Sequence, residues 1–181
     1  VVDNTKHKIK IFCPKYLKNL GNVTKNELEN ILKINCELCD FTELHSIKKQ
    51  HINEYFFIIG FSCQNLKISH SFKYFLYQLE QVNNEEKYET VFTKENKELI
   101  FYSIITFDYS KLNIKKYPEE LKNKVTFLPP LINIKKINKI QKKYDVLFFG
   151  ANTQRRQNII KNLNNFFSVK YVTNVYGKEL E

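Results

Sequence analysis

One short stretch of the chain places arginine, a residue that the rest of the chain avoids, just after a predicted strand. Residues 144–157 read YDVLFFGANTQRRQ, and Arg155 and Arg156 are the only arginines among 29 basic residues. Gly150 allows the backbone to turn tightly, and the helix expected after it begins with unpaired N–H groups that favour an anion. A guanidinium group at this place adds bidentate hydrogen bonds to phosphate oxygens. The stretch therefore predicts a diphosphate site at Gly150 and Asn152, with Arg155 or Arg156 as the charged donor.

The alternative interpretation of the two arginines is structural. Both are then solvent-facing helix residues, or one of them packs against a neighbouring domain. The stretch matches neither the P-loop pattern nor the G-x-G-x-x-G pattern of dinucleotide-binding proteins. The predicted phosphate role therefore depends on the position of the loop and on residue type.

A second set of polar residues follows two apolar segments in the first part of the chain. Glu80 and Gln81 follow one segment, and Asp108, Tyr109 and Ser110 follow the next. Ligands of parallel α/β sheets bind at the carboxyl ends of the strands, so we expect these five residues to line a cleft. A carboxylate there can act as a general base when it reaches a hydroxyl group, but the sequence identifies no catalytic base. The alternative is that they are turn and cap residues.

The elements that must position these residues follow from the apolar pattern. Strands are expected over residues 7–14, 41–47, 54–62, 72–81, 104–110, 124–132, 144–150 and 167–173. Helices are expected over residues 24–39 with a capping box at Thr24, from about Thr93 to 103, over 110–123 with Ser110 as cap, and after Asn152 or Thr153. This order predicts an α/β fold, a Rossmann-like and mainly parallel sheet with helices on both faces, followed by the first β-α-β of a second Rossmann-like domain.

Composition limits the class of protein and its compartment. The chain has 181 residues, 43% hydrophobic and 27% charged, which is ordinary for a soluble globular protein. No apolar run approaches the roughly 20 residues that span a bilayer, so no membrane span is predicted. The chain begins at Val1 and contains no methionine, and we expect its native N-terminus to lie outside this sequence. Four unevenly spaced cysteines predict a reducing, cytoplasmic compartment.

The cysteines and the net charge can be explained without a metal site or a nucleic-acid partner. Cys36 and Cys39 form a C-x-x-C without a second such pair, which favours small buried residues over a metal site. The net charge of +10 suggests nucleic acid, but the abundance of Lys, Asn, Ile, Tyr and Phe is typical of an AT-rich genome. The lysines are spread along the chain and the aromatic residues lie mainly in apolar strands. A basic nucleic-acid-binding module is therefore the least favoured class.

Several segments, in order, resemble glycosyltransferase-like proteins of the GT-B architecture. The segments are FLYQLEQ, FDYSKLNI, VTFLPPL, YDVLFFGANTQRRQNII and VYGKELE, and they span residues 72–181. The first seventy residues fit only in the order of strands and helices. One departure is Phe107, where the relatives often carry tryptophan, and phenylalanine keeps the aromatic volume there.

The resemblance implies two Rossmann-like domains that face a cleft, with no bound metal or other cofactor needed for catalysis. Residues 1–133 are then the acceptor-side domain, 134–143 a linker, and 144–181 the truncated start of the donor-side domain. A sugar would pass from a nucleotide sugar, whose diphosphate meets the Gly150 turn, to a glycan, lipid or protein acceptor. The chain alone would be catalytically incomplete.

Two further expectations complete this interpretation. The alternative to an enzyme is a non-catalytic Rossmann-like domain that serves in binding or assembly. A solitary β-α-β unit would expose an apolar sheet face, so we expect residues 144–181 to pack on the first domain or on a second copy of the chain, as in a homodimer.

Overall fold

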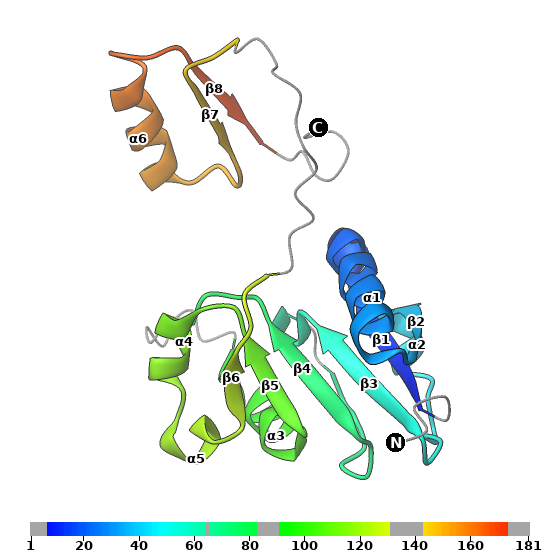
Figure 1. Cartoon of the computed structure of the whole chain (residues 1–181). Helices are drawn as coiled ribbons and strands as arrows, with labels where there is room; N and C mark the ends of the chain where they lie inside the picture. The colour runs from blue at the N-terminus through cyan, green and yellow to red at the C-terminus, as the bar shows by residue number, and fades with distance from the viewer. Residues whose placement is uncertain (1–6, 64–65, 83–90, 131–142, 174–181) are drawn as a thin grey trace. The chain divides into compact units, whose positions relative to one another are not determined.

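The chain has an α/β fold, as the order of its apolar segments predicted (Figure 1). This computed structural model describes residues 7–63, 66–82, 91–130 and 143–173. The chain divides into two compact units, Val1–Asn133 and Ile134–Glu181, and each unit is described by itself. Apart from Lys143, the predicted linker at 134–143 lies outside the described residues.

The first unit is built on a six-stranded parallel sheet with the strand order β2-β1-β3-β4-β5-β6. The strands are β1 (Lys8–Cys13), β2 (Asn35–Asp40), β3 (Glu54–Ile59), β4 (Tyr74–Gln78), β5 (Ile105–Asp108) and β6 (Val125–Phe127). The helices are α1 (Lys18–Leu32), α2 (Phe41–Leu44), α3 (Lys94–Tyr102), α4 (Lys111–Lys116) and α5 (Glu119–Lys122), with short 3-10 turns η2 (Lys15–Leu17) and η3 (Phe61–Cys63). The strand order reverses between β1 and β3, as it does at one point in every doubly wound, Rossmann-like parallel sheet.

Both faces of this sheet bury apolar side chains, because successive residues of a strand point to opposite faces. Phe56 and Ile58 of β3 belong to a core with Leu99 and Ile100 of α3. Phe57 and Ile59 of the same strand belong to a second core, against which α1 packs through Leu20 and Leu28. Strands buried on both faces account for continuous apolar runs such as YFFII.

The sequence analysis was wrong about the elements between residues 24 and 47. The helix α1 begins at Lys18, so Thr24 is a buried helix residue and not a cap. Residues Asn35–Asp40 form β2 and pair with β1, although the helix predicted over 24–39 included all of them except Asp40. The predicted strand 41–47 contains the short helix α2, because Asp40 and Glu43 form a capping box, with Asp40 N donating to Glu43 Oε1 at 2.8 Å.

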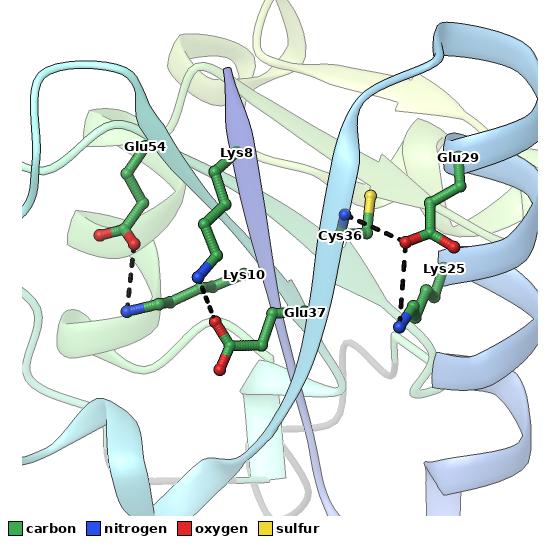
Figure 2. A network of polar contacts seen from close by, with 7 residues as sticks. All are labelled: Lys8, Lys10, Lys25, Glu29, Cys36, Glu37 and Glu54. Atoms are coloured by element: carbon green, nitrogen blue, oxygen red, sulfur yellow. Dashed lines mark hydrogen bonds and ion pairs between the residues drawn. The ribbon is translucent and has the colours of Figure 1, made fainter. Parts of the chain in front are cut away.

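Ion pairs join neighbouring elements near the amino ends of the first strands (Figure 2). Lys8 of β1 pairs with Glu37 of β2 at 2.5 Å, which raises the pKa of the lysine and lowers that of the carboxyl through their hydrogen bond. Lys10 pairs with the buried Glu54 of β3 at 3.1 Å. Glu29 of α1 accepts a hydrogen bond from the backbone N–H of Cys36 at 3.2 Å. These contacts link α1, β1, β2 and β3.

The second unit contains a parallel pair of strands, β7 (Val146–Phe149) and β8 (Val169–Val172), joined by α6 (Gln154–Leu163). Ile160 of α6 is buried, and Leu147 and Phe149 on alternate positions of β7 are 57% and 59% exposed. This is the β-α-β order predicted from the sequence.

Candidate functional site

At the carboxyl end of β5, Asp108 is fully buried and its carboxylate is the centre of a hydrogen-bond cluster. Its Oδ1 accepts from the backbone N–H of Ser110 at 2.8 Å and from Asn113 Nδ2 at 3.1 Å. Its Oδ2 accepts from the hydroxyl of Tyr117 at 3.0 Å. Asn113 and Tyr117 are also buried. The cluster joins the end of β5 to both ends of α4.

Burial dominates the electrostatics of this cluster. It raises the pKa of the Asp108 carboxyl, although the hydrogen bonds from Ser110, Tyr117 and Asn113 act in the opposite direction. Burial and the nearby carboxylate also raise the pKa of the Tyr117 hydroxyl. The carboxylate of Asp108 therefore has a structural role: both of its oxygens accept hydrogen bonds from residues of the same unit, which hold α4 against the end of β5.

The cluster connects the predicted cleft residues that follow β4 with those that follow β5. Asn113 Nδ2 also donates to the carbonyl of Glu80 at 3.0 Å, and its Oδ1 accepts from Val82 N at 3.2 Å. The loop after β4 is thereby tied to the loop after β5. Glu80 is half-buried and Gln81 is exposed.

Tyr109 and Ser110 differ in their surroundings. Tyr109 is half-buried and packs against the same core as α1, and burial raises the pKa of its hydroxyl. Ser110 caps α4, with Oγ accepting from the N–H of Asn113 at 3.4 Å. The predicted cap is thus present.

Sequence analysis missed Gln78, a fully buried polar residue at the carboxyl end of β4. Its Oε1 accepts from Ser62 Oγ at 2.8 Å and from the backbone N–H groups of Leu79 and Glu80 at 2.8 and 3.1 Å. Its Nε2 has no hydrogen-bond partner. The one available signal was a polar residue at the end of the aromatic strand YFLYQ, where a ligand of a parallel sheet would approach.

A cavity of about 340 Å³ lies at the carboxyl ends of β1 and β2, beside the start of α1. It is lined by Cys13, Pro14, Lys15, Lys18, Leu38, Cys39 and Asp40. Asp40 caps α2, and hydrogen bonds from Thr42 lower the pKa of its carboxyl. None of these residues was predicted as a site, because the sequence analysis placed most of them inside a helix or a strand.

In the second unit, the side chain of Arg156 lies against the turn between β7 and α6. Gly150 has a φ of +137°, and a Cβ at this position would lie 2.6 Å from Nη1 of Arg156. Nη1 of Arg156 donates to the carbonyl of Ala151 at 2.8 Å, and the guanidinium carbon lies 5.9 Å from the centre of the Phe148 ring. The positive φ favours glycine at residue 150, whereas the guanidinium group is the end of a flexible side chain that could move away from a Cβ.

The other predicted residues of this turn have different roles. Thr153 caps α6, with Oγ1 accepting from the N–H of Arg156 at 3.4 Å. Asn152 is exposed and its Oδ1 accepts from Gln157 Nε2 at 2.8 Å. Arg155 is exposed on the first turn of α6. Of the two arginines, Arg156 is the one whose guanidinium lies against the turn.

The thiols of the C-x-x-C pair lie in separate cores. Cys36 and Cys39 are both buried on β2, on opposite faces of the sheet, and burial raises the pKa of each thiol to about 11. Among the described residues, no group of three or more His, Cys, Asp or Glu side chains is arranged to hold a metal ion. In the same part of the chain, no helix has the length and apolarity needed to cross a membrane.

Comparison with known proteins adds no relative to this description. No protein-family model matches the chain, and no curated protein matches its sequence.

Proposed function

We propose that this chain is the N-terminal region of a GT-B glycosyltransferase, which transfers a sugar from a nucleotide sugar to an acceptor. The first unit is the acceptor side, and the second unit is the start of the donor side. The motif order over residues 72–181 suggested this class. Two successive parallel α/β units are the architecture that this class requires.

The charge of the second unit supports a donor with a diphosphate. Residues 134–181 hold ten basic and three acidic residues, a net charge of +7, whereas residues 1–133 hold nineteen and sixteen, a net charge of +3. Most of the positive charge therefore belongs to the smaller unit. A unit with this balance attracts anionic ligands.

The observation that carries the proposal is the position of Arg156 over the Gly150 turn. Its side chain is only partly exposed and lies beside the start of α6, where backbone N–H groups favour an anion. One of its N–H groups is held by the Ala151 carbonyl, which orients the guanidinium. An oriented guanidinium loses less conformational freedom when it binds a diphosphate.

The exposed apolar face of β7 supports the same assignment. A two-stranded sheet is only marginally stable by itself, and Leu147 and Phe149 are more than half exposed. Both features are expected for one part of a larger donor-side domain.

A second candidate function is a non-catalytic Rossmann-like binding domain. The observation that favours it is the burial of Asp108, because that carboxylate is occupied by Ser110, Asn113 and Tyr117. A screen of nucleotide sugars for hydrolysis by the full-length gene product separates the two candidates. Turnover of any nucleotide sugar supports the enzyme, whereas binding without turnover supports the second candidate.

The proposed donor site is tested by nucleotide-sugar affinity in the same full-length product. Arg156→Ala should weaken binding about 10- to 150-fold, since a hydrogen bond to a charged group contributes roughly 1.5–3 kcal/mol. Arg155→Ala should have a smaller effect because its side chain is exposed and no hydrogen bond orients its guanidinium among the described contacts. Lys161→Ala, which removes one exposed charge from the last turn of α6, is the control for net charge. If Arg156→Ala and Lys161→Ala weaken binding equally, the phosphate role of Arg156 is wrong.

A further inference from the structure

A second basic site lies on the first unit, near the amino ends of β3 and β4. It is a cavity of about 220 Å³ between two loops of the chain. The residues that line it are Lys48, Lys49, Gln50, His51, Ile52, Ser71, Phe72 and Lys73. Three lysines and a histidine are therefore among eight lining residues, and none of the eight is acidic. It lies at the opposite end of these strands from Gln78 and Asp108, so it is separate from the candidate site described above.

The two loops that form this cavity are held together by hydrogen bonds. Gln50 Nε2 donates to the backbone carbonyl of Lys73 at 2.9 Å, and the backbone N–H of Lys73 donates to Gln50 Oε1 at 2.6 Å. The side-chain amide of Gln50 thus takes the place of a strand partner for the backbone of Lys73, which lies 23 residues further along the sequence. Lys73 Nζ also donates to the carbonyl of Ile52 at 3.3 Å. These hydrogen bonds hold the two loops next to one another in the absence of a ligand.

The base of the cavity is anchored in the core of the unit. Phe72 is half-buried and contacts Phe56 edge-to-face, with ring centroids 5.5 Å apart. Lys73 lies over the ring of Tyr55, with Nζ 5.6 Å from the centroid. Lys73 is therefore positioned by its neighbours, and Lys48, Lys49 and Lys73 are all exposed.

Nearby carboxylates are engaged elsewhere. Glu54, which follows the first loop, pairs with Lys10 (Figure 2). Glu98 pairs with His70 at 3.1 Å, and the ring of His70 stacks on Tyr102. Positive charge without a neutralising carboxylate in the lining is a feature of anion sites.

We propose that this cavity binds one phosphate group, either inorganic phosphate or the phosphate of a small organic molecule. Its volume is below the roughly 300–1,000 Å³ of pockets that enclose drug-sized ligands, so it suits a single ionic group and not a whole nucleotide. Lysine ammonium groups and the hydroxyl of Ser71 supply donors for phosphate oxygens. This proposal does not depend on glycosyltransferase activity, because it concerns residues of the first unit alone.

The proposal is tested by nuclear magnetic resonance of the full chain titrated with orthophosphate and, separately, with glycerol 3-phosphate. Background ionic strength is held constant with sodium chloride. We expect saturable shifts of the backbone amides of Gln50, Ser71 and Lys73 with at least one of the two ligands, and the tighter ligand identifies the source of the phosphate. The shifts should persist in the double variant Arg155→Ala/Arg156→Ala, which separates this site from the proposed donor site.

Charge-removing variants decide whether the lysines form the site. Lys48→Gln/Lys49→Gln should weaken binding at least tenfold, and Lys48→Arg/Lys49→Arg should retain it, because guanidinium groups also bind phosphate. Lys94→Gln/Lys97→Gln removes the same charge from α3 and should leave the affinity unchanged. Unchanged amide spectra away from the cavity show that each variant is folded. The proposal is overturned if neither ligand gives saturable shifts, or if the two glutamine double variants weaken binding equally.

Discussion

Replacing Asp108 tests whether its buried carboxylate anchors the carboxyl edge of the first unit. In Asp108→Ala, the donors of Ser110, Asn113 and Tyr117 lose their shared acceptor, and Asn113 Nδ2 keeps only its bond to the carbonyl of Glu80. A hydrogen bond to a charged group contributes roughly 1.5–3 kcal/mol, and the three bonds do not add in full. We therefore expect Asp108→Ala to lower the free energy of unfolding by about 3–5 kcal/mol.

The conservative variant Asp108→Asn separates the hydrogen bonds from the charge. An asparagine oxygen can still accept from Ser110 and Asn113, and its amide group can donate to the hydroxyl of Tyr117. The variant also removes a charge whose burial is unfavourable. At pH 7 we expect Asp108→Asn to change stability by less than about 1 kcal/mol, because these effects oppose one another.

The pH dependence of stability gives an independent readout of the same carboxyl. Burial raises the pKa of Asp108 in the folded state, so the folded chain binds this proton more tightly than the unfolded chain does. The stabilising contribution is then fully present below the unfolded pKa of about 3.9 and is lost as pH rises through the folded value. Relative to the wild type, Asp108→Asn should therefore become more stable as pH rises from about 4 towards 7.

The assay is chemical denaturation of the full chain at several pH values, followed by far-ultraviolet circular dichroism and by tyrosine fluorescence, since the chain contains no tryptophan. Asp40→Ala is the control, because Asp40 also accepts backbone and hydroxyl hydrogen bonds but does so at an exposed helix cap. That loss is typically about 1 kcal/mol. The anchor role is refuted if Asp108→Ala costs no more than Asp40→Ala.

Two further predictions concern the packing of α1 and the thiols of β2. Gly21→Ala should destabilise the chain by up to about 2 kcal/mol, because a Cβ there lies 2.8 Å from both Cys13 Sγ and Leu38 Cδ1. The higher helix propensity of alanine offsets only part of this overlap. Denaturation midpoints measure the loss of stability, and the control Asn22→Ala, at the next, exposed position, should not destabilise the chain. Cys36 and Cys39 should react with iodoacetamide at pH 7.5 far more slowly in the folded chain than in urea, since both are buried with a thiol pKa of about 11. Mass spectrometry over time measures this, and equal rates in the two states would contradict the burial.

The sequence predicted the strands well where an apolar run is continuous along the chain. β3, β4, β5 and β7 are apolar runs that end in glycine or in polar residues, and a helix would need a different period. The segment Asn35–Asp40 was harder to assign from sequence. It contains two cysteines and a leucine among polar residues, and this pattern fits the period of a helix as well as that of a strand. Pairing with β1 decides that this segment is a strand, and pairing is a tertiary effect that local sequence does not contain.

Site residues show the same difference between local and non-local information. The caps at Ser110 and Thr153 were predictable, since each depends on a hydroxyl residue followed by a helix. The partners of Asp108 were not predicted, because Tyr117 lies nine residues away and reaches the carboxylate only after α4 is formed. Likewise, Gln50 and Lys73 are 23 residues apart in the sequence, and no local pattern around either residue predicts their hydrogen bond.

In the proposed reaction, the burial of Asp108 limits which carboxylate can act as the general base for the acceptor. A general base must reach the hydroxyl proton of its acceptor, and the carboxylate of Asp108 faces only donors of its own unit. Glu80 keeps a half-buried side chain at the same edge while its backbone is fixed by Gln78 and Asn113. The partly exposed carboxylate of Glu80, on a fixed backbone, meets the geometric requirement for a general base better than the fully buried carboxylate of Asp108. Of the two acidic residues predicted for this cleft, Glu80 is therefore the one whose side chain is available to a ligand.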